Sequence, residues 1–346
     1  MIWNDGYTAR YHLHAVNRDT WENAEELDGV LSVSIERDGT GDAPMLESGS
    51  AEILADVGAE FGEGYYRVSM DAISGSEREH VDIATLYFRS SSGTTDYGVS
   101  ELQIDCKSVL FPADERKLIR GEYAQKGVDG AQYAAELLRA CVHAPVAVAA
   151  SFTLDEHVVF DIGDSYLEAA WRVLKAGNCI IAINGRGEIT IAKKPTEPTL
   201  VLDSVNASLL MPTVKPSIDY DGIPNRYTAI DEFETVTIEN TDRNSITSIP
   251  TRGYIKDEVD ESPERVNGET LTAYARRKLR ELSTVDDMRV YDREYFPNVY
   301  PFSIVRGNLP NVGIDGDLVV RSQSLKIEHG IKVTEKAARE VVTWEG

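Results

Sequence analysis

The residues that could do chemistry in this chain are few and scattered. Six histidines occur: His12, His14, His80, His143, His157 and His329. His12 and His14 are two residues apart in a segment that alternates like a strand, so both side chains would share one face, as two metal ligands do. No nearby cluster of Cys or His completes a site, although carboxylates from elsewhere in the chain could. We therefore expect surface strand histidines, no metal site and no cofactor.

Two acidic turns contain the residue types of a calcium loop, Asp38-x-x-x-Asp42 and Asp315-x-Asp317. Neither has the spaced series of oxygen ligands that defines an EF-hand loop. Glycine supplies positive φ in both segments, and aspartate bonds its own backbone, which is ordinary turn chemistry. We expect turns there.

Sequence signatures of an enzyme are absent. Gly185-x-Gly187 precedes a strand pattern, whereas a phosphate cradle needs a helix N-terminus behind its glycines. No Gly-x-Ser-x-Gly occurs, and the three cysteines lie in no catalytic motif and have no CxxC spacing. Paired carboxylates for sugar hydrolysis cannot be singled out among 58 acidic residues. We expect no enzyme, and a carbohydrate-active β-rich enzyme using paired carboxylates remains the alternative.

The charge balance limits the class of partner. The 346 residues carry 35 basic and 58 acidic side chains, a formal net charge of −23. This argues against a broad nucleic-acid grip, which needs Lys and Arg on phosphates, but allows an acidic channel through which DNA slides. Acidity for solubility alone is the simpler interpretation. No run approaches the roughly 20 apolar residues of a membrane helix, and no signal peptide is visible, so we expect a soluble protein made in a cytoplasm.

The first part of the chain predicts many short strands. Residues 7–16 alternate in part and 29–37 more clearly, and further candidate strands, separated by Gly/Ser clusters, cover 50–54, 65–71, 80–89 and 99–108. Many short strands of this kind are typical of a barrel or sandwich. After Pro112 the period becomes helical. Helices are predicted near 130–142 and 165–176, with Asp129 as one cap and Ser165 with Glu168 as a capping box at the other. A hairpin over 179–192 follows, turning at Asn184-Gly185-Arg186-Gly187.

The second part returns to strands around one helix. Residues 200–216 read as a connection, because Pro212 and Pro216 argue against a central strand. Strands are predicted at 225–230, 234–239 and 246–249, then at 299–304, 318–322, 325–329 and 331–334, and no internal repeat is visible. A helix over 270–283 presents Arg276, Arg277 and Arg280 outward. These arginines are either a solvated face or a contact with an acidic neighbouring subunit.

The order of motifs in the last third resembles the hub, or tail-associated, protein at the tip or baseplate of phage tails and of contractile tail-like particles. The motifs are a strand beginning Asn225-Arg226-Tyr227, a patch over Asp242–Ser245, a corner Arg252-Gly253-Tyr254, the helix 270–283, and a turn from Pro310 to Gly316-Asp317. The resemblance marks Asn225, Tyr227, Ser245, Arg252, Gly253, Pro310, Gly316 and Asp317 as structural motif residues.

The resemblance implies a β-rich α+β fold. It has two tube-like β-barrel domains, at 1–112 and at 200–255 with 300–346. A small helical α/β domain at 113–199 lies between them, and a helical insertion at 256–299 interrupts the second barrel.

It further implies a structural protein of the virion tail tip, assembled in the host cytoplasm. Three subunits with two barrels each would form a six-part ring matching a hexameric tail tube. The ring would gate passage of the tape-measure protein and of a genome that is not specifically bound. Expected partners are the tail tube, distal tail and tape-measure proteins and a central spike or receptor-binding tip protein, with no further receptor-binding or lytic module in this chain. A monomeric β-domain binding module is the other alternative.

Overall fold

The structure is a computed structural model that describes residues 7–39, 43–56, 62–96, 99–203, 210–263, 265, 269–328 and 330–346. Contacts divide the chain into two units, Met1–Val214 with Tyr291–Ala337, and Lys215–Val290 with Ala338–Gly346. The predicted β-rich α+β class is confirmed. Among the described residues, no helix is long and apolar enough to cross a membrane.

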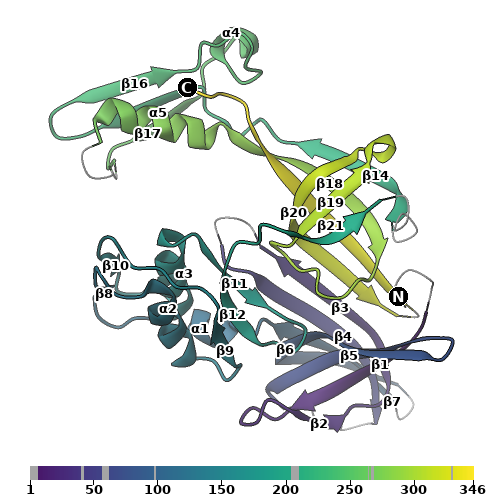
Figure 1. The fold of residues 1–346 in the computed structure, drawn as a ribbon. Coiled ribbons are helices and arrows are strands. Elements are labelled where there is room, and N and C mark those ends of the chain that lie inside the picture. The colour runs from purple at the N-terminus through teal and green to yellow at the C-terminus, as the bar shows by residue number, and fades with distance from the viewer. Residues whose placement is uncertain are drawn as a thin grey trace. The chain divides into compact units, whose positions relative to one another are not determined.

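A first set of strands comes from the N-terminal part of the chain (Figure 1). Its members are β1 (Thr8–Val16), β2 (Asn23–Glu26), β3 (Val30–Asp38), β4 (Leu46–Asp56), β5 (Gly64–Ser74), β6 (Glu77–Asp96) and β7 (Val99–Lys107). They pair antiparallel in the order β3-β4-β7-β6-β5-β1-β2. The predicted alternation holds in the later part of β3, where Val33 and Ile35 are buried and Glu36 is exposed, whereas Leu31, on the same face as Val33, is exposed.

A second set comes from two later parts of the chain. It contains β13 (Pro198–Leu202), β14 (Leu210–Ile218), β18 (Thr284–Glu294), β19 (Ile304–Leu309), β20 (Ile314–Ile327) and β21 (Ile331–Val342), paired in the order β14-β18-β21-β20-β19-β13. The expected connection over 200–216 was wrong, since β13 and β14 lie there. Both end the paired path, and an end strand tolerates Pro216 because one of its edges needs no hydrogen-bond donor.

The two sets repeat one strand order. Apart from β2, each set has six strands, and in sequence rank both paths read second, third, sixth, fifth, fourth, first. At one corresponding pair the strand direction differs, because β1 runs antiparallel to β5 whereas β13 runs parallel to β19. The internal duplication that the sequence conceals is therefore present in the topology.

Each set contributes to a buried core, and the core of the first set also includes Leu325 and Ile327 of β20 and Ile331 and Val333 of β21. In the first, Leu13 of β1 and Val33 of β3 belong to one buried cluster, although their strands stand far apart along the paired path. In the second, Leu202 of β13 lies in a buried cluster, and Val214 of β14, from the opposite end of the path, packs against that cluster. An antiparallel pairing of β3 with β20, here called the seam, joins the two sets into one sheet.

A helical block lies in sequence between the sets (Figure 1, teal). It comprises α1 (Phe111–Glu115), β8 (Glu122–Ala124), α2 (Gly130–Arg139), β9 (Val146–Val148), β10 (Val158–Phe160), α3 (Tyr166–Ala176), β11 (Cys179–Ile183) and β12 (Ile189–Lys193). Asp129 accepts from two N–H groups at the start of α2, and Ser165 with Glu168 makes both bonds of a capping box on α3. The contact division keeps 1–112 and 113–199 in one unit.

The second unit contains an inserted module, defined as β15 (Arg226–Ile230), β16 (Thr235–Glu239), α4 (Ile249–Arg252), β17 (Asp257–Asp260) and α5 (Leu271–Leu282). Its strands pair in the order β16-β15-β17, and α5 packs Leu271, Ala275 and Leu279 against Tyr227 and Trp344.

The inserted module differs from the sequence-based boundaries. We placed 200–255 with the second barrel and 256–299 in the insertion. The structure instead inserts β15 through α5 between β14 and β18, and β18 belongs to the large sheet. The strand expected at 246–249 was also wrong, because Ser248 caps α4 there and Pro250 suits a first helical turn. Alternation shows that β15 is a half-buried strand but does not indicate its partner.

Candidate functional site

Asn225 joins the start of β15 to the corner that precedes β17. Its side-chain amide donates to the Tyr254 carbonyl (3.0 Å), and its Oδ1 accepts from the Lys256 N–H (2.8 Å). Its own N–H donates to the Lys256 carbonyl (3.0 Å). The side chain is fully buried, so a residue that both donates and accepts is required there.

The Arg252-Gly253 corner closes α4. Gly253 takes φ +72° and donates its N–H to the Ile249 carbonyl (2.8 Å), a left-handed helix end that favours glycine. The Arg252 guanidinium donates to the carbonyls of Ile223 (2.7 Å) and Tyr220. The arginine therefore anchors the loop before β15 onto the corner.

Tyr227 shares an acceptor with a tyrosine of α5. The hydroxyls of Tyr227 (2.9 Å) and Tyr274 (2.6 Å) both donate to Oδ2 of Asp260. The bond from Tyr274 is the main reason that the pKa of Asp260 lies below its usual range, and burial raises the pKa of Tyr227. This cluster fastens β15, β17 and α5 to one another.

Ser245 belongs to a buried hydroxyl chain. It accepts from Asn240 Nδ2 (2.8 Å) and contacts the Thr247 hydroxyl (3.1 Å), which in turn contacts that of Thr343 (3.0 Å). The chain connects the patch after β16 with the C-terminal segment of the same unit. Asn225, Tyr227, Ser245, Arg252 and Gly253 therefore meet in one module, and their contacts are structural.

The remaining motif residues lie in the second strand set. Pro310 begins a short 3-10 turn between β19 and β20, and Gly316 takes φ +84°. Asp317 receives two bonds from Arg306 on the neighbouring strand, at 2.6 and 2.8 Å. That pairing neutralises one carboxylate of the segment considered as a calcium loop. Asp42 and His329 lie outside the described residues.

Two of the three arginines on α5 form ion pairs with carboxylates of the same chain. Arg277 donates to both oxygens of Glu269 (2.9 Å each) and to Glu281 (3.0 Å), and Arg280 donates to Glu345 (3.1 Å). Arg276 is exposed, and no ion pair joins it to another described residue. Contact of this face with an acidic subunit stays a prediction that now rests mainly on Arg276.

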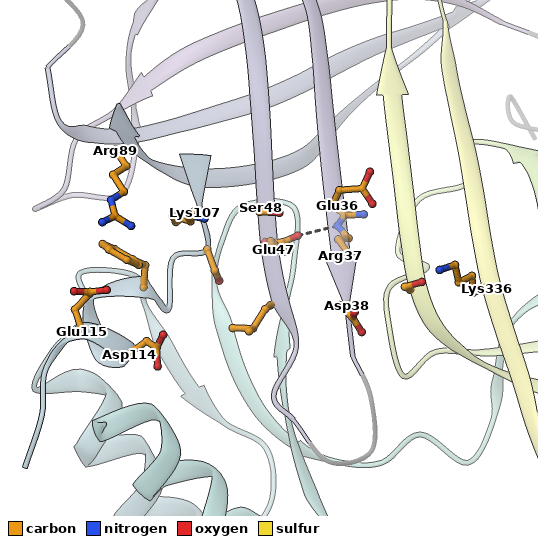
Figure 2. Close-up of a pocket in the computed structure, with 14 residues that line it drawn as sticks. Glu36, Arg37, Asp38, Glu47, Ser48, Arg89, Lys107, Asp114, Glu115 and Lys336 are labelled. Atoms are coloured by element: carbon orange, nitrogen blue, oxygen red, sulfur yellow. Dashed lines mark hydrogen bonds and ion pairs between the residues drawn. The ribbon is translucent and has the colours of Figure 1, made fainter. Parts of the chain in front are cut away.

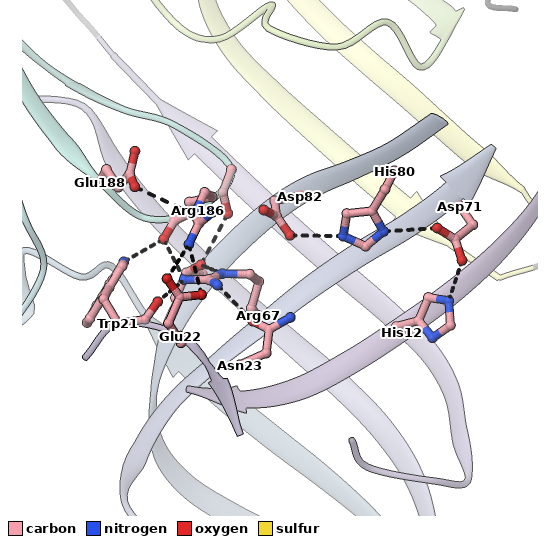
Figure 3. A network of polar contacts seen from close by, with 12 residues as sticks. His12, Trp21, Glu22, Asn23, Arg67, Asp71, His80, Asp82, Arg186 and Glu188 are labelled. Atoms are coloured by element: carbon pink, nitrogen blue, oxygen red, sulfur yellow. Dashed lines mark hydrogen bonds and ion pairs between the residues drawn. The ribbon is translucent and has the colours of Figure 1, made fainter. Parts of the chain in front are cut away.

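The structure adds a docking site that the sequence did not indicate (Figure 3). The turn Asn184–Gly187 of the helical block, here the hairpin turn, lies against β5 and β6 of the first set. Its Arg186 carbonyl accepts from Trp21 Nε1 (2.8 Å) and from the Arg67 guanidinium (3.1 Å). A Cβ added at Gly185 would lie 1.8 Å from the Asp82 carbonyl oxygen, so only glycine fits this approach.

A network of buried charged and polar side chains crosses the seam, and the sequence did not indicate this network either. Arg37 donates to Glu47 (2.8 Å) and to Gln323 (3.4 Å), and Gln323 donates to Glu335 (2.7 Å). Glu335 also accepts from Arg293 (2.6 Å) and Tyr291 (2.6 Å). These six residues form the seam network.

The two carboxylates of the seam network differ in their surroundings. Burial raises the pKa of Glu47, whose Oε2 has no hydrogen-bond partner. Burial alone would also raise the pKa of Glu335, but its donors, led by Arg293, outweigh burial and lower it. The carboxylate with several donors is therefore the one whose pKa is lowered.

A cavity of about 580 Å³ is lined by the first set, by α1, and by Ser322 and Lys336 of the second set (Figure 2). Its charged lining mixes both signs: Glu36, Arg37, Asp38, Glu47, Arg89, Lys107, Asp114, Glu115 and Lys336. None of the hydrogen bonds described among these residues joins a nucleophile to a base, which a covalent mechanism requires. We assign no reaction to this cavity.

The predicted pairing of His12 and His14 on one face of β1 is present, and their rings stack at 5.9 Å. The structure adds Glu26 of β2, so that one ligand atom from each of the three side chains lies within 4.8 Å of the others. Glu26 was missed because pairing of such a short strand is not visible in the sequence.

Comparison by sequence finds nothing: no family model and no curated protein matches this chain. Comparison of structures does. The 43 kDa tail protein of prophage MuSo2 from Shewanella oneidensis is 12% identical, with a TM-score of 0.64 over 96% of this chain and 98% of that one. The tail protein from Neisseria meningitidis MC58 is also 12% identical, with a TM-score of 0.65 over 96% and 97%.

A third structure, of the Francisella PdpA–VgrG complex, is 7% identical and has a TM-score of 0.58. The match covers 96% of this chain and 58% of that one. At identities this low the similarity of structure shows the fold alone, and for the two tail proteins it does so from end to end. The chain therefore has the β-rich α+β fold of these phage tail proteins, and the PdpA–VgrG complex contains a similar fold.

Proposed function

We propose that this chain is a structural hub protein of a phage tail tip or baseplate. The observation that carries the proposal is the end-to-end similarity of fold to two phage tail proteins, each covered almost completely. The contacts of the sequence motif residues agree with a structural role. They are buried hydrogen bonds and exposed cross-strand pairs, and none resembles a reaction centre.

The proposed assembly is a homotrimeric ring. Two strand sets with one strand order support this, because three chains would then offer six similar units to a hexameric tail tube. Such a ring would lie at the virion tail tip, assemble in the host cytoplasm, and contact tail tube, distal tail and tape-measure proteins and a central spike or receptor-binding tip protein.

A passage role follows from the ring. The tape-measure protein and then the genome would cross its opening. A net charge of −23 disfavours adhesion of phosphate, so the DNA would slide without specific binding.

Light scattering after size exclusion, followed by electron microscopy, tests the assembly. We expect a particle of three chains of 38.3 kDa each and a ring with a central hole. Addition of a hexameric tail tube protein should give a larger complex. A protein that stays monomeric at high concentration and does not bind the tube protein would refute the ring. Muralytic activity of the purified chain would refute a purely structural role.

A further inference from the structure

Five polar side chains of the first strand set lie close together: His12 and His14 of β1, Glu26 of β2, Asp71 of β5 and His80 of β6. Figure 3 shows Asp71 of β5 lying between His12 of β1 and His80 of β6. His12 Nε2 lies 3.1 Å from Asp71 Oδ2, and His80 Nδ1 lies 2.9 Å from Asp71 Oδ1. On the other side of His12, its Nδ1 lies 2.6 Å from Glu26 Oε1, and His14 stands beside it.

Both ring nitrogens of His12 therefore face carboxylate oxygens. A neutral imidazole has a single N–H, which satisfies one of these contacts and leaves the other nitrogen and a carboxylate with opposing lone pairs. Asp71 also accepts from the Arg78 guanidinium (2.5 Å), which provides a positive partner for this carboxylate. When Nε2 donates to Asp71, a cation between Nδ1 and Glu26 satisfies the remaining contact, and either a second ring proton or a metal ion can supply it.

We propose that His12, His14 and Glu26 bind one divalent transition-metal ion of the zinc class. Two imidazoles and one carboxylate are the ligand set that Zn²⁺ accepts, while Ca²⁺ and Mg²⁺ prefer oxygen alone. Three protein ligands leave a fourth position for water. A cavity of about 220 Å³ lined in part by His12 and Glu26 leaves room beside the ligands.

Strand pairing already fixes the backbone positions of the three ligands, so binding of the ion requires little further ordering of the chain. His12 and His14 project from the same face of β1, while Leu13 between them is buried in the core. Glu26 stands directly opposite His14 in the pairing of β1 with β2. Small side-chain rotations would bring the ligand atoms to the roughly 2.0–2.2 Å that zinc bonds require.

Asp71 has the place of a positioning residue. A metal-bound histidine usually donates its other ring N–H to a carboxylate, which fixes the tautomer and the ring orientation. Asp71 accepts that hydrogen from Nε2 and is itself held by Arg78 (2.5 Å) and His80. Nδ1 then faces Glu26 and the metal position.

The metal would fasten β2, whose four residues are all exposed, to β1. The segment at the start of β2 also meets the hairpin turn, since Glu22 pairs with Arg186 (3.4 Å), and it meets β5, since Asn23 Oδ1 accepts from Arg67 (2.7 Å). Zinc should therefore stabilise the contact between the first set and the helical block. This inference does not depend on the proposed function.

Calorimetric titration of the tag-free, chelator-treated full chain with Zn²⁺ tests the site. We expect saturable binding of one ion per chain, no comparable binding of Mg²⁺, and slower amide exchange in Asn23–Glu26 in the zinc-loaded protein. The Co²⁺ form should show nitrogen and oxygen ligation without a thiolate charge-transfer band. A thiolate band, or no saturable binding, would overturn the proposal.

Variants assign the ligands. His14→Ala and Glu26→Gln should each weaken Zn²⁺ binding by at least about tenfold, and Asp71→Asn, which keeps all three ligands, by about 10–100-fold. His157→Gln, an exposed histidine elsewhere, is the matched control and should leave affinity unchanged. Unchanged affinity in folded His14→Ala and Glu26→Gln proteins would refute the assignment.

Discussion

Replacing Glu335 by Gln removes the most heavily bonded charge of the seam network. Glu335 is fully buried and Arg293 is 1% exposed, so the change leaves a buried guanidinium without its counter-ion. Breaking one partner of a buried ion pair costs about 3–5 kcal/mol. Glu335→Gln should lower the free energy of unfolding by this amount.

The chain contains a matched control on its surface. Arg306 and Asp317 also form a two-bond pair across neighbouring strands of the second set, but both side chains are 44% exposed. Exposed pairs contribute at most about 1 kcal/mol, so Asp317→Asn should change stability little.

Urea unfolding followed by fluorescence and circular dichroism measures the difference. With an m-value of about 2–3 kcal/mol/M, the loss in Glu335→Gln corresponds to a midpoint lowered by at least about 1 M, against less than about 0.5 M for Asp317→Asn. Protein concentration must be equal in all samples because assembly stabilises the folded state. Adding Arg293→Met to Glu335→Gln removes the orphan charge and should restore part of the loss. Similar midpoints for the buried and exposed variants would refute the reasoning.

Three further changes test other contacts. Gly185→Ala should destabilise the protein by at least about 2 kcal/mol and loosen the hairpin turn, because the added Cβ would clash with the Asp82 carbonyl. Gly121 has open space around it, so Gly121→Ala is the control and should leave thermal unfolding nearly unchanged. Asn225→Asp removes the donor to the Tyr254 carbonyl and should cost about 1–3 kcal/mol, with faster amide exchange at the corner; exchange unchanged there would contradict its assigned role. The pKa of Asp71 is lowered on folding, so its contribution to the free energy of unfolding is present above about pH 4 and is lost as the pH falls toward the folded pKa. The free energy of unfolding should therefore depend less on acid pH in Asp71→Asn than in the unchanged protein. An identical pH profile would count against the network.

Local signals predicted much of the fold correctly because their causes are local. The cap at Asp129, the capping box at Ser165 and the turn at Asn184–Gly187 depend on hydrogen bonds and φ values within a few residues. The face shared by His12 and His14 follows from the period of a strand. The order of the later motifs was enough to indicate a tail-protein fold.

Long-range pairing was not predictable in the same way. Alternation indicates which face of a strand is buried but not which strand lies beside it. Residues 217–255 therefore read equally well as barrel strands, and only their pairing places β15 and β16 in the inserted module. Pro216 argued against a strand, yet β14 tolerates it at the end of the sheet.

The sequence by itself determined composition, charge and local conformation: a β-rich acidic chain, the helix caps, the glycine turns and the spacing of two histidines. Only the tertiary structure decided which distant residues meet. It brought residues 37, 47, 323 and 335 into the seam network, placed Gly185 against the Asp82 carbonyl, and set Glu26 beside His12. It also revealed two sets with one strand order in a chain without a visible repeat. The physical reason is that strands pair through backbone N–H and C=O groups. Two strand sets can therefore keep the same order although their side chains differ.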